Sequence, residues 1–337
     1  MDLRNWRPVS QLKAKETLLT RAKIPVIDAH NHLGSVKDVG KLVADMDELN
    51  IQTIINLDGV YANDGFYREQ ERFADAYPSR FGVLCQIDIT QIDAPDFGKK
   101  MDAHITACVN RGACGIKFNK FMVGLKAKDA SGKYIKPDDP RLTPVWDCAA
   151  RHNIPILIHI ADPVAFFTPT DEKNERFEEL DEHPSWSYYN AGTPSWDELI
   201  AAQENMLRAN PQTTYVIPHI GSNAENLANV GRMLDTYPNM YVDTAERIHE
   251  LGRQPYTARE FLIKYADRVI YGTDLVPNAH NTSYNYRFFE TQDEYFPYNT
   301  LEEHNQGRWM IYGVYLPDDA LQKIYVDNAE QLYFGRK

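Results

Sequence analysis

The chain has 337 residues, of which 43% are apolar and 25% charged, and its formal net charge is −12. This length can bury the core of one large domain, because α/β barrels often exceed ~250 residues as single domains. The acidic balance argues against a nucleic-acid partner, which needs a basic surface, and no apolar run approaches the ~20 residues that span a bilayer.

The N-terminal segment, residues 1–23, is polar and charged, and it lacks the hydrophobic stretch of a signal peptide. We expect it to be an extension that precedes the domain. The four cysteines form no CxxC pair, which favours buried free thiols in a reducing compartment. These features together predict a cytoplasmic protein.

Eight short apolar runs follow along the chain, separated by stretches with helical spacing. The predicted strands are Ile24 to Asp28, Ile51 to Leu57, Arg80 to Asp88, Ala113 to Phe118, Ile154 to Ile160, Thr214 to His219, Met240 to Asp243 and Arg268 to Gly272. Most are continuous apolar runs, as expected for parallel strands that are covered on both faces. Eight strand–helix units predict an α/β fold, a (β/α)8 TIM barrel in one domain over 1–337. Its last helix is predicted over Asp318 to Leu332.

Three segments are too long for a minimal barrel: residues 122–141, 161–193 and 276–306. Each follows a predicted strand, so each insertion should extend the loops of the C-terminal face, where barrel enzymes carry their chemistry. Long loops in a compact domain are usually functional or disordered, and the aromatic content of these segments argues against disorder.

Metal-capable side chains recur at the C-terminal ends of these predicted strands. His30 and His32 end the first strand, where alternate residues point the same way. His159 ends the fifth, His219 ends the sixth, and Asp274 follows the eighth. Barrel strand ends converge on one opening, and histidine with carboxylate is a typical ligand set of catalytic zinc. The pattern predicts a metal site there.

These motifs resemble those of the amidohydrolase superfamily, and most closely the branch that holds aminocarboxymuconate-semialdehyde and resorcylate decarboxylases with related lactonases. The resemblance covers nearly the whole chain and is carried by IDAHNHLG at 27–34, GIKFNK at 115–120, IHIAD at 158–162, IPHIGS at 217–222, YGTDL at 271–275 and VDNAEQLYFG at 326–335. Their order and strand placement are specific to the superfamily, but not to one reaction.

The resemblance implies a role for each matching position. His30, His32, His159 and Asp274 match the metal ligands, and Asp274 would also accept and return a proton as a catalytic group. His219 matches a histidine that transfers a proton or stabilises an oxyanion in members with one metal ion. We expect one divalent ion, with zinc as the first choice and manganese as an alternative.

Two cations are predicted to bind substrate. Lys117 ends the fourth strand, where it would bind a substrate carboxylate or hydroxyl, become carboxylated to bridge two metal ions, or reach solvent. Arg247 follows the seventh strand in DTAER and would pair with an anionic substrate.

The first functional hypothesis is a hydrolase of a small amide, lactone or ester that uses metal-activated water. The alternative is a metal-dependent non-oxidative decarboxylase, and the predicted ligands do not separate the two. A TatD-like nuclease needs a fourth-strand carboxylate that GIKFN lacks, and a non-enzymatic binding protein is the last alternative. The expected partner is a small-molecule substrate. Barrels of this kind are often dimers, so a homodimer is expected as one assembly, although the sequence leaves the oligomeric state open.

Overall fold

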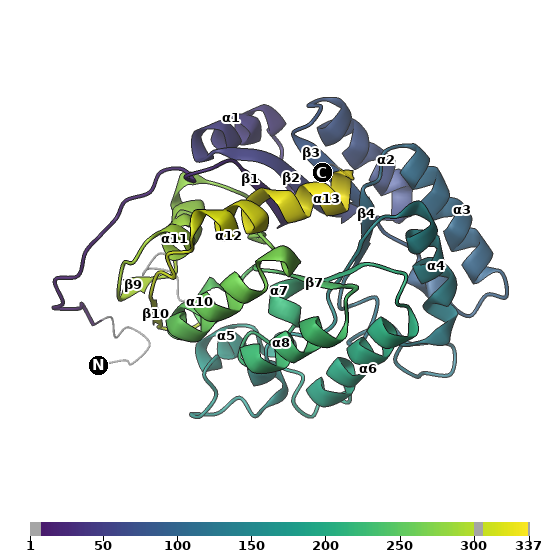
Figure 1. Cartoon of the computed structure of the whole chain (residues 1–337). Coiled ribbons are helices and arrows are strands. Elements are labelled where there is room, and N and C mark those ends of the chain that lie inside the picture. The colour runs from purple at the N-terminus through teal and green to yellow at the C-terminus, as the bar shows by residue number, and fades with distance from the viewer. Residues whose placement is uncertain (1–7, 300–305, 336–337) are drawn as a thin grey trace.

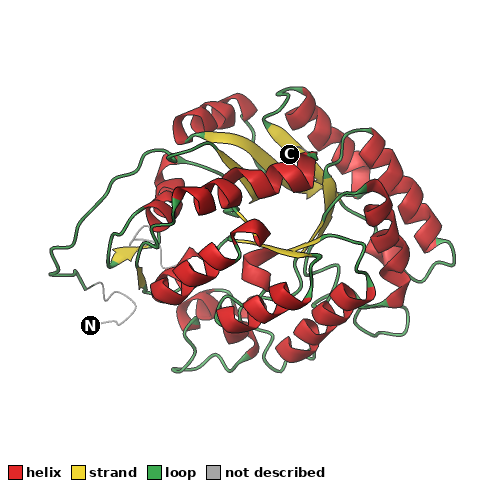
Figure 2. Cartoon of the chain, viewed as in Figure 1, coloured by secondary structure: helices red, strands yellow, loops and turns green. Residues whose placement is uncertain are grey.

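A computed structural model describes residues 8–299 and 306–335. Eight parallel strands lie side by side in chain order, each hydrogen-bonded to the next. They are β1 (Val26–Asn31), β2 (Ile51–Gly59), β3 (Phe81–Cys85), β4 (Gly115–Phe118), β5 (Ile156–Ile158), β6 (Tyr215–Ile217), β7 (Met240–Asp243) and β8 (Val269–Ile270). Helices surround this sheet (Figures 1 and 2). The structure therefore confirms the predicted (β/α)8 barrel.

The first and last strands approach each other and nearly close the barrel. The backbone N–H of Ala29 donates to the carbonyl of Tyr271 at 3.0 Å, and that of Asp274 donates to the carbonyl of His30 at 2.8 Å. The second of these bonds places Asp274 directly beside the end of β1. A position that lies 244 residues away along the chain thus becomes a neighbour of the first histidine.

Helices follow the strands along the chain, and those of the outer layer pack their apolar sides on the strands. They are α1 (Val39–Leu49), α2 (Gly65–Glu69), α3 (Phe97–Asn110), α4 (Thr143–His152), α5 (Phe177–Glu182), α6 (Trp196–Ala209), α7 (Pro218–Gly221), α8 (Leu227–Thr236), α9 (Ile248–Arg253), α10 (Pro255–Lys264), α11 (Ala279–Glu290), α12 (Asp318–Gln322) and α13 (Asn328–Phe334). In α1, for example, Leu42, Met46 and Leu49 are buried, which is the helical spacing of one apolar side.

The segments predicted as insertions carry short elements of their own. Residues 122–141 contain a bridge between Lys128 and Tyr134, 161–193 contain α5, and 276–306 contain α11 and strand β9 (Phe296–Pro297), which pairs with β10 (Met310–Ile311). Residues 300–305 of the last segment lie outside the described residues, as do residues 1–7 of the N-terminal extension. The domain boundaries themselves stay a prediction.

The described part of the N-terminal extension runs along the outside of the barrel without helix or strand (Figure 1). Thr17 attaches the extension to the barrel, because its backbone N–H and its hydroxyl both donate hydrogen bonds to the Asp293 carboxylate at 2.6 and 2.7 Å. All four cysteines are buried and unpaired. None of the helices in the described ranges has both the length and the apolar character that a membrane span requires.

Candidate metal centre

A cavity of about 610 Å³ lies at the C-terminal ends of the strands, within the usual size range of small-molecule sites. Its walls come from segments that follow β4 to β8. The lining includes Lys120, His159, Asp162, Phe166, Arg176, Glu179, Trp186, His219, Glu246, Arg247, Asp274, Tyr284 and Gln306. Three of the predicted site histidines and acids, together with Arg247, therefore face one cavity.

The first-strand histidines are each held by a carboxylate. The Nδ1 of His30 lies 2.7 Å from Oδ2 of Asp243, and the Nδ1 of His32 lies 2.5 Å from Oδ1 of Asp58. Their Nε2 atoms turn the other way, at 3.7 and 3.9 Å from Oδ1 of Asp274. The alternation expected of strand β1 thus brings both rings to one carboxylate.

His219 follows β6 in a left-handed backbone conformation, with φ of 58°. Two contacts hold it: its backbone N–H donates to Asp243 Oδ1 at 2.9 Å, and its Nδ1 lies 2.8 Å from the carbonyl of Ala245. Since a carbonyl only accepts, Nδ1 carries the hydrogen and Nε2 is bare. Burial, together with nearby His159 and Arg247, holds the pKa of His219 well below its usual value, so the ring is neutral.

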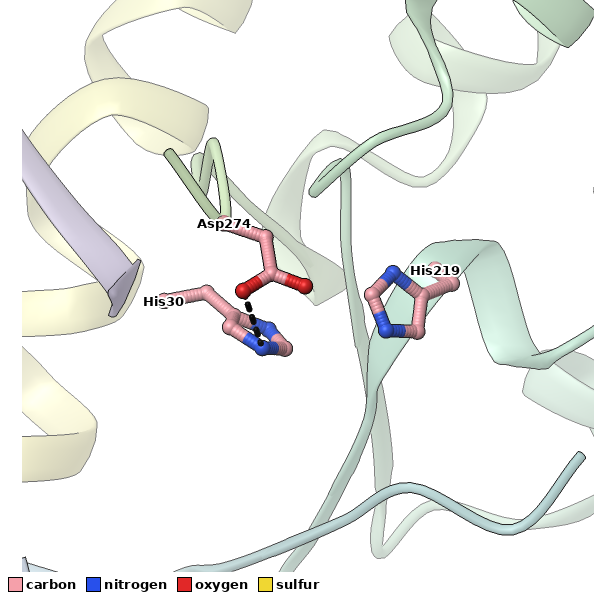
Figure 3. A group of neighbouring side chains, drawn as sticks. All are labelled: His30, His219 and Asp274. Carbon is pink, nitrogen blue, oxygen red and sulfur yellow. Dashed lines mark ion pairs between the residues drawn. The ribbon is translucent and has the colours of Figure 1, made fainter. Parts of the chain in front are cut away.

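Asp274 completes the tightest donor group of the described residues, His30, His219 and Asp274, whose donor atoms all lie within 4.8 Å of one another. Figure 3 shows the Asp274 carboxylate between the two rings, with one oxygen directed to His30. The left-handed φ of Asp274, 59°, and its backbone bond to His30 turn the side chain into this position.

The donors fit a divalent metal ion. The Nε2 atoms of His30, His159 and His219 are buried, and none has a hydrogen-bond partner in the described part of the protein. Burying a polar atom without a partner costs about 1–3 kcal/mol, so three such atoms beside a carboxylate indicate a missing common partner. Imidazole nitrogens with a carboxylate oxygen suit zinc, manganese or iron.

His159 lies beside this group and contacts a further acid. Its ring centre is 4.4 Å from that of His219, and its Nε2 is 3.2 Å from Oδ1 of Asp162, although the direction is not that of a hydrogen bond. Burial lowers the pKa of His159 to about 4, so this ring too is neutral and can act as a ligand.

The predicted ligand set of His30, His32, His159 and Asp274 thus gathers in one place, and it stays a prediction. The tightest group includes His219, which sequence reasoning kept out of that set. Its bare Nε2 has the position required of a metal ligand as well as of a proton-transfer group.

The two predicted substrate-binding cations are buried, and neither forms an ion pair with another described residue. Lys117 is 1% exposed and Arg247 is 7% exposed. Among the described residues, no carboxylate lies within ion-pair distance of either, and the Arg247 guanidinium donates only to the carbonyl of Glu246. Burial lowers the pKa of Lys117 to about 8, although Asp274, Asp243 and Asp58 favour its charged form. Arg247 lines the cavity.

Sequence reasoning missed three carboxylates beneath the donors: Asp28, Asp58 and Asp243. Asp28 accepts hydrogen bonds from the backbone N–H and the hydroxyl of Thr273 at 3.0 and 2.6 Å, and so joins β1 to the residue before Asp274. Each acid stands in or at the end of an apolar strand, and this placement was the only signal available. Acids that have no contact with the site can also lie in or at the end of an apolar strand, so this placement does not single out these three.

Comparison with known families decides the classification. The family model described as amidohydrolase matches residues 27–335, which is most of the chain. The chain belongs to the amidohydrolase family. Among curated proteins, no match reaches significance.

Solved structures of low sequence identity share the fold of this amidohydrolase. A 2,6-dihydroxybenzoate decarboxylase from Rhizobium is 16% identical, with a TM-score of 0.55, over 92% of this chain and 98% of its own. A dihydroxybenzoic acid decarboxylase from Polaromonas, solved with manganese and 2-nitroresorcinol, is 15% identical, with a TM-score of 0.56, over 93% and 98%. A 4-oxalomesaconate hydratase from Rhodopseudomonas palustris is 14% identical, with a TM-score of 0.53, over 91% and 95%. At such identities the likeness establishes the barrel, and family membership makes the protein an enzyme of the amidohydrolase superfamily.

Proposed function

We propose that this amidohydrolase is a metal-dependent lyase that removes carbon dioxide from a small carboxylic acid without oxidation. The observation that carries the proposal is Arg247, a buried guanidinium that lines the cavity without a carboxylate partner among the described residues. Glu179, Glu225, Glu246 and Glu250 lie close enough to feel its charge, but none forms an ion pair with it. A buried guanidinium is most stable with a direct partner, and an anionic substrate would supply one. A guanidinium also binds a carboxylate with two parallel hydrogen bonds.

His30, His32, His159 and Asp274 would hold the metal ion, which when bound polarises a substrate oxygen and acidifies bound water, and Nε2 of His219 would stay available for proton transfer. Arg247 would hold a substrate carboxylate and so orient the molecule. The bond between the carboxyl carbon and its neighbour breaks, the electron pair stays on the neighbouring carbon, and that carbon takes a proton. His219 would deliver this proton from Nε2 after taking it from solvent, because its neutral ring has Nδ1 fixed on Ala245.

The named structural neighbours agree with a lyase. Two of the three act as decarboxylases of dihydroxybenzoic acids, and the third is a hydratase. The manganese in the Polaromonas enzyme makes manganese as strong a candidate as zinc here. Substrate identity does not transfer at 14–16% identity, so the proposal is limited to a small acid that fits the cavity.

Hydrolysis of a lactone, ester or amide by metal-activated water is the second candidate. One observation favours it: the Asp274 carboxylate accepts no hydrogen bond from the described residues while it lines the cavity. A carboxylate of the donor group that accepts no hydrogen bond from these residues has the position needed to accept a proton from water and return it to a leaving group.

Product analysis separates these two reactions. Purified protein would be loaded with manganese or zinc, its metal content measured, and panels of hydroxylated aromatic acids and of lactones assayed for carbon dioxide and for ring opening. We expect carbon dioxide from at least one acid, and none with the Asp274→Asn variant. Ring opening of a lactone without any decarboxylation would instead establish the hydrolase.

Arg247→Met tests the observation on which the proposal depends. Loss of a charge-assisted pair worth about 1.5–3 kcal/mol should raise KM for the acid roughly 10- to 150-fold. The matched control is Arg232→Met, because Arg232 pairs with Glu204 on the exposed surface. An unchanged KM in Arg247→Met would remove the basis for an anionic substrate.

A further inference from the structure

The two carboxylates behind the first-strand histidines form a second layer under the donor group. Asp58 is the penultimate residue of β2, and its side chain is 24% exposed, whereas Asp243 ends β7 and is fully buried. Each faces the Nδ1 of one histidine, and the Nε2 of that histidine faces Asp274. Each histidine ring therefore lies between an outer carboxylate and the donor site.

A carboxylate at Nδ1 decides which imidazole nitrogen can bind a metal ion. An ionised carboxylate only accepts hydrogen bonds, so a neutral ring facing it must carry its hydrogen on Nδ1. The lone pair then stands on Nε2, the atom turned to the site. Such outer partners also fix the plane of the ring and raise the basicity of the donor nitrogen.

Asp243 positions groups at two different strands, β1 and β6. Its Oδ2 contacts His30 Nδ1 at 2.7 Å, and its Oδ1 accepts the backbone N–H groups of His219 at 2.9 Å and of Ala245 at 3.1 Å. The bond from the His219 backbone N–H supports the left-handed backbone at His219. This conformation costs about 1 kcal/mol or more in a residue with a Cβ. One buried acid thus aligns a ring from β1 with a backbone turn after β6.

Asp58 acts on the more exposed ring. His32 has a side chain that is 45% exposed and therefore free to rotate without a partner. Asp58 Oδ1 contacts its Nδ1, and Asp58 Oδ2 accepts the backbone N–H of Gly34 at 2.7 Å. A Cβ at Gly34 would come within 2.9 Å of that same oxygen, so the glycine permits this close approach. The acid thereby fixes both the ring and the loop that follows it.

We propose that Asp58 and Asp243 are positioning residues that hold His32 and His30 in the Nδ1–H tautomer and thereby set the metal affinity of the site. The inference rests on the proposed function only in requiring that the donor group binds a metal ion. Substituting a partner of this kind typically lowers metal affinity 10- to 100-fold.

Two variants and one control test the inference. Asp58→Asn keeps the shape of the side chain, lies at a partly exposed position and should fold. Asp243→Asn removes one acceptor from a fully buried junction. The control is Asp88→Asn, because Asp88 also follows a strand, but within the described part of the chain its side chain accepts hydrogen bonds only from Thr90 and Gln91.

The first measurement is the dissociation constant of manganese and of zinc, obtained by competition with a fluorescent chelator. We expect a 10- to 100-fold increase for Asp58→Asn, at least as large an increase for Asp243→Asn, and no change for Asp88→Asn. Wild-type protein that binds neither ion would overturn the proposed metal enzyme as such. Wild-type protein that binds metal with the same affinity as Asp58→Asn would overturn only the positioning role.

The second measurement is the tautomer of each ring, read from ¹⁵N chemical shifts of histidine-labelled, metal-free protein at a pH above 8. We expect the Nδ1–H form for His30, His32 and His219. In Asp58→Asn, His32 alone should change. A doubly protonated His32 in the wild type would show an ordinary ion pair, and an Nε2–H form would show that the ring faces the wrong way. Either result contradicts the inference.

Discussion

At the scale of single residues, the site combines buried carboxylates with one buried ammonium group. Asp243 accepts three hydrogen bonds, and the adjacent His30 ring holds its pKa below the usual value despite burial. Lys117 lacks any such partner among the described residues, and burial lowers its pKa to about 8. A group that gives up stability in this way is expected where substrate or metal chemistry requires it.

Replacing Lys117 by methionine should therefore stabilise the metal-free protein. A pKa lowered from 10.5 to about 8 corresponds to roughly 3 kcal/mol at neutral pH. Because the unfolded chain binds the proton more tightly, this cost is complete below about pH 8 and disappears as the pH rises through about 10.5. Urea unfolding of Lys117→Met and wild type across that range would check it.

Lys264→Met serves as the control, because Lys264 forms an exposed pair with Asp235 and its removal should change the free energy of unfolding by less than about 1 kcal/mol. If Lys117→Met is less stable than wild type at neutral pH, the attraction of Asp58, Asp243 and Asp274 for the ammonium group outweighs the cost of its burial.

At the scale of elements, three loops that follow different strands meet at Arg176. This residue precedes α5 and contacts Glu179 of α5 at 2.7 Å and Glu250 of α9 after β7. Its guanidinium also lies 5.5 Å from the ring centre of Trp309, in the segment after β8. Three of the segments that form the cavity wall are thus joined through one buried guanidinium.

Arg176→Met should destabilise the protein by about 3–5 kcal/mol, because Glu250 would keep a buried charge without its counter-ion. Adding Glu250→Gln on that background should recover part of the loss. Arg151→Met is the control, since Arg151 pairs with Asp102 on the surface and should cost less than about 1 kcal/mol. Denaturant midpoints with unchanged slopes would measure these differences. A double variant less stable than Arg176→Met would refute the charge explanation.

At the scale of the whole molecule, the sequence was enough to predict the order of the strands. It predicted only some of the contacts between residues at the strand ends. The predicted strand Met240 to Asp243 has the same bounds as β7, because Pro238-Asn239 before it and a polar loop after it mark both ends of the apolar run. The predicted helix over Asp318 to Leu332 instead divides into α12, a π-helical turn and α13, a change of pitch that apolar spacing does not reveal.

The convergence of His30, His159, His219 and Asp274 followed from their placement at strand ends, since a barrel brings those ends together. The roles of Asp58 and Asp243 did not follow. They depend on the direction in which each ring turns, and His219 takes its left-handed backbone from a bond to an acid 24 residues further on. The direction of each ring is set by contacts between side chains from different strands. The sequence of one strand therefore does not predict it.

The proposed metal ligands join the two edges that close the barrel, because His30 belongs to β1 and Asp274 follows β8. A metal ion bound there should stabilise the entire fold, by about 2.7 kcal/mol at a free concentration 100 times its dissociation constant. Thermal unfolding with added manganese or zinc would show a rising midpoint, reversed by a chelator. His30→Asn should abolish the shift. His152→Asn, on α4 and bonded to Thr106, should retain it, because that ring lies outside the donor group. An equal shift in His30→Asn would place the bound ion elsewhere, since a site that has lost a first-strand donor cannot join β1 to β8 with the same affinity.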